Sequence, residues 1–572
     1  MRVSALSGTF TLEVITGSSA VVGGSVFRGR AAAAVLGAPS TSRVTATCTR
    51  RSTCVLSPPA TDRPFSRELG FVVVGGMELD KMDENDWRYH GEGNKSLVVS
   101  HVQLSRVLRL LKYPAEDSEN PPQTPEQAFR QIQSIVDFSS KVMSSLLGEK
   151  FIHSGEVVKL PLEFVRQLSI RVQHQRPAWR CDKVMDIYSG CALCLPNLTS
   201  PALHQPTHTP PLCIEIKPKC GFLPSSKHVS KDIKTKVCRF CMHQHYKVAN
   251  GKWKRRSLYC PLDLFSGNKQ RMHFAIRHLI EEPQNNFKIF KGGQCIYSSK
   301  EGSDDCMDLN SLLHHLRPYF LYGNNRINSH VTGKAVVNDF IQVLVNALLS
   351  GGGGDGGVVT DRCGEGRSFC EASLFNKERI RHGSQGLPSD SVLSRILQTQ
   401  MLDTLDIEGL HPLYRRVEQH LQDFPKERTR LQIDGPYNQA FLEKLQKCPA
   451  EDDGSVDFAV AKVHQYRVAM TAKDCSIMVA LVPGPEEEEE EDEGQRWLRD
   501  FLSSRPPAFS YSVSILDLDP KPFDGIPRQL RLDQRIVSCY SRTGAAAPKA
   551  SLPPPPPPSA ERDDCTLLFH PV

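Results

Sequence analysis

The chain has 572 residues, of which 39% are hydrophobic and 23% charged, and it carries a formal net charge of +6 at pH 7. This length exceeds one ordinary hydrophobic core, so we expect more than one packed unit. The longest apolar stretch, near residues 340–349, has the length of a core helix, so the sequence is not that of a membrane-spanning chain, and its composition excludes collagen and coiled-coil classes.

The first 76 residues differ in composition from the rest. Up to residue 60 they contain six Arg, no Lys and a single acidic residue, Glu13. This composition is typical of a transit-like leader. It is also typical of translated upstream sequence, because Met77 opens a segment that is rich in acidic residues. We favour the second interpretation and exclude residues 1–76 from the predicted fold.

A small α+β lobe is predicted next, over residues 77–200. Residues 96–102 and 106–112 alternate or run apolar, as adjacent strands do. Thr124 then precedes Pro125 and Gln127, which is the pattern of a helix N-cap followed by the first helical turn. Apolar residues continue at helical spacing as far as Gly148, which we expect to end the helix.

A larger lobe is predicted over residues 201–545, followed by a proline-rich tail over residues 546–572. We expect strands at residues 213–219, 466–471, 476–482 and 510–517, and helices near residues 268–282, 392–405 and 413–421. Disorder is predicted for the glycine-rich segment 350–390, the acidic segment 483–495, and residues 543–563 with their six consecutive prolines.

The net charge is too mild to indicate general coating of nucleic acid, and the distribution of charges favours an anionic ligand for the folded part. Acidic residues gather at residues 486–493, which contain seven Glu and one Asp, so the rest of the chain is more basic than the net charge suggests. The 18 Cys are too sparse for a small disulfide scaffold. Buried reduced thiols in a cytosolic or nuclear protein are expected instead.

Two neighbouring segments of the first lobe have features of a nucleotide site. The turn at residues 91–94 contains two glycines, whose backbone can approach a ligand closely and offer N–H groups to phosphate oxygens. An ordinary hairpin turn is the alternative, and the P-loop signature is missing. Arg109 and Lys112 lie on the next predicted strand, where either cation faces nucleotide phosphates or remains solvated.

Three segments of the second lobe combine charges in a similar way. Side chains two apart on a strand share a face, so Glu215, Lys217 and Lys219 are expected to project together and to hold an anion between the two ammonium groups. Asp474 lies at a predicted strand–turn–strand junction, where it can orient a hydroxyl or accept its proton, or simply form an Asx turn.

Asp517 and Asp519 end an apolar strand and share a face by the same period, which suits Mg²⁺, and Lys521 follows them.

A Cys/His segment leaves two interpretations open. Cys238 and Cys241, followed by His243 and His245, provide zinc-ligand types, but the spacing is tight for a tetrahedral site and no second Cys pair follows. The favoured interpretation is a helix with one face of core thiols.

Taken together, a glycine turn, strand cations, an isolated Asp and an Asp-rich strand end are the parts that phosphoryl transfer needs. The chain also resembles a known family in segments that follow one another from about Met82 to Tyr540. Seven segments are similar to those of the inositol-pentakisphosphate 2-kinases, and they resemble the vertebrate form most in sequence. They are YHGEGNKSLVV, EIKPKCGF, MHQHYK, YCPLDLFSGN, QNNFKIF, YRVAMTAKDCSIM and LDLDPKP.

The resemblance implies an enzyme that uses ATP and Mg²⁺ to phosphorylate the axial 2-hydroxyl of inositol 1,3,4,5,6-pentakisphosphate. It implies a two-lobed inositol-polyphosphate-kinase fold distantly related to protein kinases, and a location in nucleus and cytoplasm. We expect a monomer with a small-molecule substrate and with no membrane or sequence-specific nucleic-acid partner.

The resemblance also implies roles for individual residues. Lys217 should bridge towards the transferred phosphate, Asp474 should orient the hydroxyl, and Asp517 should bind Mg²⁺, with Asp519 as a second candidate ligand. The residues expected to hold the nucleotide are Gly91, Glu92, Gly93, Asn94, Arg109, Asn197 and Glu215. The residues expected to grip the inositol phosphates are Arg180, Lys219, Lys247, Asn285, Asn286 and Lys521.

Gly525 and Gln529 depart from the Arg and Tyr that some members of the family place there. A different class of function remains as an alternative. The Cys/His segment and the basic excess also fit a zinc-stabilised, non-catalytic binding module or an RNA-associated scaffold.

Overall fold

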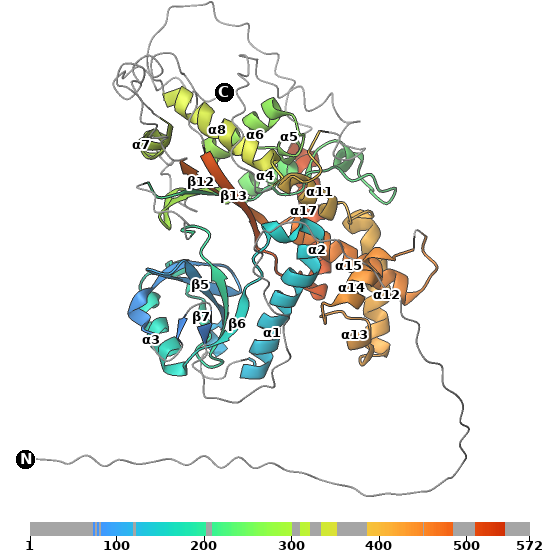
Figure 1. The fold of residues 1–572 in the computed structure, drawn as a ribbon. Coiled ribbons are helices and arrows are strands. Elements are labelled where there is room, and N and C mark those ends of the chain that lie inside the picture. Colours follow the sequence, from blue (N-terminus) through green and yellow to red (C-terminus); the bar gives the residue numbers. More distant parts are fainter. Residues whose placement is uncertain are drawn as a thin grey trace, which may run out of the picture. The chain divides into compact units, whose positions relative to one another are not determined.

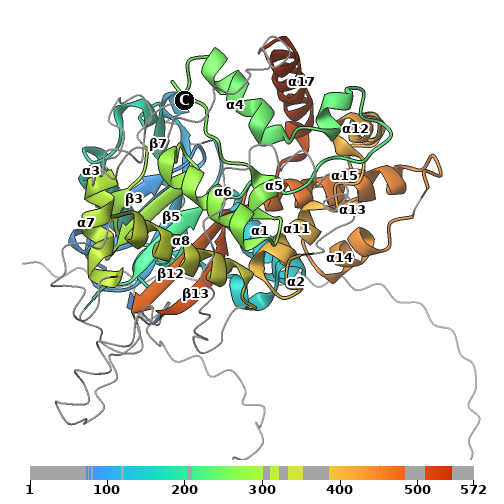
Figure 2. The same ribbon diagram turned by 90° about the horizontal axis from the view of Figure 1, so that it is seen from above.

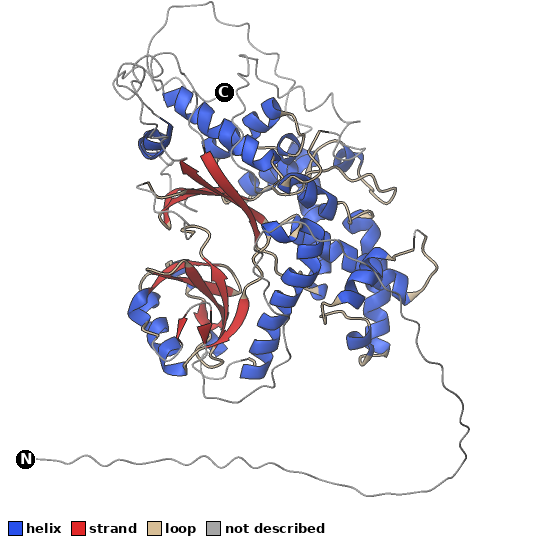
Figure 3. Cartoon of the chain, viewed as in Figure 1, coloured by secondary structure: helices blue, strands red, loops and turns tan. Residues whose placement is uncertain are grey.

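The computed structural model describes residues 73–74, 77–78, 82–117, 122–201, 209–299, 309–320, 333–351, 386–449, 451–483 and 509–543. Helices and antiparallel sheets make up these ranges (Figures 1 and 3), which confirms the predicted α+β class. Segments 1–76, 350–390, 483–495 and 546–572, which we predicted to be leader, inserts and tail, lie wholly or mostly outside them. Val73–Val74 (β1), at the end of the predicted leader, pairs with Met77–Glu78 (β2).

The first large sheet contains the strands between residues 87 and 196. Its order is β3-β4-β5-β8-β6, with β7 pairing with β5, and each pairing is antiparallel. Successive side chains of a strand face opposite sides, so the sheet supports two hydrophobic clusters, one beneath α3 and one beneath α1. The strands and the helix α3 are β3 (Trp87–Glu92), β4 (Ser96–His101), β5 (Arg106–Pro114), β6 (Glu156–Lys159), β7 (Lys183–Met185), β8 (Cys191–Pro196) and α3 (Leu162–Gln173).

The helix after β5 begins as the sequence predicts. The Thr124 hydroxyl accepts a hydrogen bond from the Gln127 backbone N–H, and the Gln127 side chain accepts one from the Thr124 backbone, so both halves of a capping box are present at the start of α1 (Pro125–Asp137). A π-helical segment (Phe138–Met143) continues into α2 (Ser144–Leu147). Gly148 then ends the helix with φ +100°, a conformation that glycine adopts without strain.

The second large sheet has the order β11-β10-β9-β12-β13, again antiparallel. Its central strand β9 pairs with both β10 and β12, so segments far apart in the sequence lie side by side. The largest hydrophobic cluster joins one face of this sheet to α6 and α8, which lie beside it in Figures 1 and 2. The strands are β9 (Leu212–Ile216), β10 (Phe287–Lys291), β11 (Gln294–Tyr297), β12 (Ser476–Pro483) and β13 (Phe509–Leu516).

Helices pack on one face of the second sheet and continue beyond it. The helix predicted near residues 268–282 is confirmed, with Asn268 as its N-cap. The predicted core helix near residues 340–349 is confirmed as the end of a longer helix. Within the described ranges, no helix combines the length and the apolar character needed to cross a membrane. The helices are α4 (Arg239–Ala249), α5 (Pro261–Leu264), α6 (Lys269–Glu281), α7 (Leu309–Phe320), α8 (Gly333–Leu349), α11 (Val392–Gln400), α12 (Asp406–Asp423), α13 (Glu427–Arg430), α14 (Gln439–Gln446), α15 (Val456–Ala472) and α17 (Ile526–Thr543).

The strand predicted at residues 466–471 is wrong, because these residues form the end of helix α15. Most of this helix is buried, including the polar side chains of His464, Arg467 and Thr471. A helix that is surrounded by protein has no polar face, so the helical periodicity that would have revealed it is missing. Asp474 therefore follows a helix and precedes β12, instead of joining two strands.

Two strands end earlier than predicted, which changes the basis of two site arguments. β9 ends at Ile216 and Lys219 has φ +62°, so Lys217 and Lys219 do not share a strand face. β13 ends at Leu516 and Asp517 has φ +62°, so Asp517 and Asp519 also lie beyond the regular strand. Whether these residues meet therefore depends on tertiary contacts and not on the period of a strand.

Candidate active site

The carboxylate of Asp474 lies between two lysines from separate segments. Its Oδ1 accepts a hydrogen bond from Lys219 Nζ at 3.0 Å, and its Oδ2 accepts one from Lys521 Nζ at 2.7 Å. Burial disfavours the ionised form of Asp474, but the two ammonium groups outweigh it and hold the pKa of Asp474 well below its ordinary value. A carboxylate flanked by two cations is suited to a site where a hydroxyl and an anionic group meet.

A second cluster lies around Lys217, next to the first. Lys217 Nζ donates to Asp517 Oδ2 at 2.5 Å and to Ser476 Oγ at 2.8 Å, and it lies 3.5 Å from Glu215 Oε1. Burial disfavours the charged form of Lys217, but Asp517 and Glu215 outweigh it and raise the pKa of Lys217. Asp474 adds a smaller effect in the same direction, so the two clusters are electrostatically connected.

One residue of the first sheet reaches the same region. Arg109, on β5, donates from Nη1 to Asp519 Oδ1 at 2.7 Å and from Nη2 to Asp519 Oδ2, which is a bidentate pair. Its Nε donates to Ser96 Oγ at 2.8 Å. The charge of Asp517 also raises the pKa of Arg109, so both candidate Mg²⁺ ligands lie near one guanidinium. The sequence argument for a shared strand face was wrong, but the two carboxylates still belong to one site.

The glycine turn is held by a buried ion-pair triad. The Glu92 carboxylate accepts hydrogen bonds from Lys112 and from Arg176, whose Nε and Nη2 lie 2.9 Å from its two oxygens. All three side chains are about 1% exposed. Glu92 and Lys112 therefore face each other inside the protein, where their charges are paired. Gly91 and Gly93 are open, since a Cβ added at either would meet no atom within 4 Å.

The triad also connects the turn to the segment that carries Arg180. Arg176 donates to the backbone carbonyl of Arg180 at 2.8 Å and to that of Lys183 at 2.7 Å. Lys183 Nζ in turn donates to the carbonyl and the Oδ1 of Asn94, at 3.1 and 3.0 Å. Arg176 was not singled out in the sequence, because a lone Arg in a turn after a helix gives no signal of burial.

Three of the other predicted site residues form hydrogen bonds within the protein. Asn197 follows β8 and accepts hydrogen bonds at Oδ1 from the backbone and the hydroxyl of Thr199. Lys247, on α4, donates to Gln284 Oε1 at 3.1 Å. Asn286 is buried and donates from Nδ2 to the Lys217 carbonyl at 3.0 Å, whereas Asn285 is exposed. Asn286 thus holds the backbone next to Lys217 by a hydrogen bond, and Asn285 lies at the surface.

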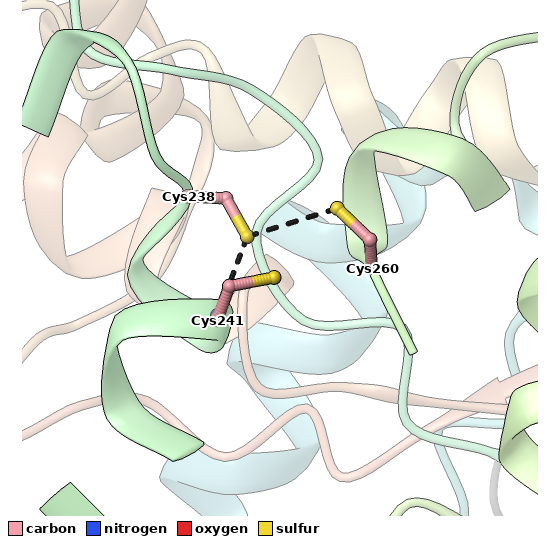
Figure 4. A group of neighbouring side chains, drawn as sticks. All are labelled: Cys238, Cys241 and Cys260. Atoms are coloured by element: carbon pink, nitrogen blue, oxygen red, sulfur yellow. Dashed lines mark hydrogen bonds between the residues drawn. The ribbon is translucent and has the colours of Figure 1, made fainter. Parts of the chain in front are cut away.

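The thiols of the Cys/His segment meet a third Cys that the sequence argument missed. The Sγ atoms of Cys238, Cys241 and Cys260 lie within 4.8 Å of one another (Figure 4). Cys238 is the N-cap of α4 rather than part of its face. His245 is directed elsewhere, with its ring nitrogens on Arg256 and Thr543. The favoured helix face of thiols is thus corrected for Cys238, and the residues that gather are three soft ligands of the kind that zinc prefers.

Comparisons with known proteins identify the family. A family model described as inositol-pentakisphosphate 2-kinase matches residues 89–535. The chain is 59% identical to the inositol-pentakisphosphate 2-kinase of Danio rerio over 505 residues, which covers 87% of this chain and 100% of that protein. It is 28% identical to the inositol-pentakisphosphate 2-kinase of Arabidopsis thaliana over 496 residues, 82% of this chain and 95% of that protein.

A rice relative, the inositol-pentakisphosphate 2-kinase IPK1 of Oryza sativa subsp. indica, is 29% identical over 493 residues, 82% of this chain and 96% of that protein. The matched region includes both large sheets, except for the first two residues of β3, and every residue of the two charged clusters. The chain therefore belongs to the inositol-pentakisphosphate 2-kinase family and is a kinase.

Proposed function

We propose that this chain transfers the γ-phosphoryl group of ATP to the 2-hydroxyl of inositol 1,3,4,5,6-pentakisphosphate, giving inositol hexakisphosphate. The observation that supports this most is Asp474, a carboxylate held by the lysines of two segments beside the Lys217–Asp517 cluster. A pentakisphosphate carries on the order of −8 to −10 charges. Such a ligand needs cations that converge from separate segments, which Lys219 and Lys521 do.

In this proposal the substrate changes the partners of Asp474. Phosphate groups beside the substrate hydroxyl draw Lys219 and Lys521 towards themselves, so the charges that stabilise the Asp474 carboxylate move away from it. Its affinity for a proton then rises, and it accepts the proton of the attacking hydroxyl. Lys217 lies between Glu215 and Asp517, where it neutralises charge on the transferred phosphoryl group.

The nucleotide side of the proposal uses Arg109 and the glycine turn. The turn leaves space at Gly91 and Gly93 for phosphate oxygens, and Arg109 exchanges Asp519 for the nucleotide phosphates. Asp517 and Asp519 are hard oxygen ligands near one guanidinium, a donor set that fits Mg²⁺. When bound, Mg²⁺ neutralises charge on the nucleotide phosphates.

The proposed reaction predicts a product that depends on both substrate and metal. With ATP, Mg²⁺ and the pentakisphosphate, the full chain should form ADP and inositol hexakisphosphate in equal amounts, measured by ion-exchange chromatography. Chelation of Mg²⁺ should abolish both products and excess Mg²⁺ should restore them, because the nucleotide phosphates then regain their counter-charge. ATP-independent binding without product would instead favour the non-catalytic module.

Removal of one gripping lysine is predicted to weaken substrate binding. Lys219→Met and Lys521→Met should each raise the KM for the pentakisphosphate about 10- to 100-fold, since a hydrogen bond to a charged group contributes about 1.5–3 kcal/mol. The KM for ATP should change little. Lys447→Met is the matched control, because the side chain of this lysine, the C-cap of α14, is 76% exposed and pairs, among the described residues, with Glu443 alone. Equal effects on both KM values would contradict the assignment of the two lysines.

Assembly and location follow the family resemblance only. We propose that the chain acts as a monomer, without a membrane or sequence-specific nucleic-acid partner, in nucleus and cytoplasm. Light scattering after size-exclusion chromatography tests the first point, and imaging of the tagged full chain tests the last. A dimer mass or a purely cytoplasmic signal would overturn the respective proposal.

A further inference from the structure

Arg467 is a buried cation that the proposed reaction does not use. Arg467 lies on α15 and is 7% exposed. Burial lowers the pKa of Arg467 despite the opposing effects of Tyr437 and Asp434. In the described part of the chain Arg467 forms no ion pair, so the desolvation of its guanidinium is compensated by hydrogen bonds to neutral groups. A buried guanidinium without an ion pair is costly, so its hydrogen bonds to the backbone carbonyls indicate a specific role.

The hydrogen bonds of Arg467 join two loops to the helix. Its Nε donates to the Lys521 carbonyl at 2.6 Å, and its Nη1 donates to the Ile433 carbonyl at 2.5 Å. One turn further along α15, the Thr471 hydroxyl donates to the Asp519 carbonyl at 3.0 Å. The helix therefore holds the segment of Asp519 and Lys521 by its backbone, and the same helix leads directly to Asp474.

The backbone of this segment lies outside the regular hydrogen bonding of the sheet. It follows the end of β13 at Leu516, so no strand ladder continues through it. Pro520 and Pro522 flank Lys521 and have no N–H to donate. The Lys521 carbonyl is thus anchored by Arg467, while its ammonium group reaches Asp474 Oδ2 at 2.7 Å.

We propose that Arg467 is a positioning residue for the inositol phosphate substrate and acts through Lys521. The fork of its guanidinium holds the Lys521 carbonyl and the Ile433 carbonyl together, so the Lys521 ammonium stays directed at the phosphate beside Asp474. This inference rests on the proposed function, because it names a determinant of binding at that same site. It adds a residue that touches neither substrate nor nucleotide.

Conservative variants separate positioning from general stability. Arg467→Lys keeps the buried charge but lacks the planar fork that bonds to two carbonyls at once. His464→Gln is the matched control, since His464 lies on the same helix, is buried, and bonds to Leu431 in the same loop without contacting Lys521. Thermal unfolding of both variants shows whether each is folded, and Arg467→Gln provides a second variant if Arg467→Lys does not fold.

The expected result is a selective loss of substrate affinity. Calorimetry should show pentakisphosphate binding weakened on the order of tenfold in Arg467→Lys, with ATP binding within about twofold of wild type and His464→Gln unchanged. In a Lys521→Met background, Arg467→Lys should add almost no further loss, because both changes then act on one interaction. Independent, additive losses, or equal losses for both ligands, would overturn the inference.

The same measurements distinguish this inference from the proposed function. Binding by calorimetry needs no turnover, so a wild-type chain that binds the pentakisphosphate but forms no hexakisphosphate refutes the reaction and still tests Arg467. A wild-type chain that binds no pentakisphosphate refutes the proposed function itself.

Discussion

Replacing Asp474 with Asn is expected to lower kcat for the pentakisphosphate by on the order of 10²- to 10⁴-fold, the usual contribution of a positioned proton acceptor. The amide keeps the shape of the side chain but cannot take the hydroxyl proton. Binding should not weaken, because the change removes the carboxylate that competes with substrate phosphates for Lys219 and Lys521. Steady-state kinetics combined with calorimetry would show a fall in kcat with an equal or lower Kd.

Asp457→Asn is the control for this change. Asp457 lies in the first turn of α15, the helix that precedes Asp474, and its side chain is 74% exposed. Its replacement should alter neither kcat nor Kd. Full turnover by Asp474→Asn would refute the role of Asp474 in proton transfer, and a large rise in Kd would show that the carboxylate contributes to binding instead.

The location of Asp474 illustrates what the sequence can predict. Its place just before a buried strand was read correctly, since residues 476–482 have the continuous apolar run of a central strand. The element on its other side was read as a strand, because a helix buried on all sides shows no amphipathic period. The α+β class, the capped helix α1 and its end at Gly148 followed from local signals of the kind that need no tertiary contact.

The convergence of charges required the structure. Lys219 and Asp474 are separated by 255 residues in the chain, and Arg109 and Asp519 by 410, so no local pattern joins them. The resemblance to the family supplied the candidates, and the contacts show that these four residues meet in pairs. Cys260 was missed because it lies 22 residues from Cys238, outside the CxxC spacing that drew attention to the segment.

Glu92 lies in the glycine turn, as predicted, but its side chain forms ion pairs within the protein. The family resemblance implied contact between Glu92 and the nucleotide, but its carboxylate forms ion pairs with Lys112 and Arg176. Burial opposes ionisation of Glu92, yet the hydrogen bonds from Arg176 and Lys112 outweigh it and lower the pKa of Glu92. Only the backbone of the turn is left to approach phosphates, so the triad acts on the nucleotide site indirectly.

Breaking this triad is expected to destabilise the protein strongly. Arg176→Met should cost about 3–5 kcal/mol of unfolding free energy, because it leaves buried charges without their full set of partners. Urea unfolding of the full chain checks this value. Arg166→Met on α3 is the control, since Arg166 and its partner Glu163 are largely exposed and 3.8 Å apart, and such pairs contribute about 0–1 kcal/mol. A cost for Arg176→Met as small as for the control would show that the triad is not a stabilising unit.

The contribution of the Glu92 ion pairs to the free energy of unfolding should depend on pH. Glu92 has a lowered pKa in the folded chain, so its pairing stabilises the fold fully above the ordinary value of 4.5 and is lost as the pH falls through the folded value. The difference in unfolding free energy between wild type and Glu92→Gln should therefore shrink as the solution is acidified below that value. A difference that stays constant would assign the effect of the variant to packing alone.

A triple variant separates stability from positioning. Replacing Glu92 and Lys112 with Met and Arg176 with Leu removes every buried charge of the triad, and such apolar replacements are often neutral for stability. The bonds from Arg176 to the carbonyls of Arg180 and Lys183 are lost as well, and with them the connection that leads through Lys183 to Asn94. The triple variant should thus recover much of the unfolding free energy that Arg176→Met loses. Its KM for ATP should nevertheless be higher than that of the wild type in steady-state kinetics, because the glycine turn no longer has a fixed support.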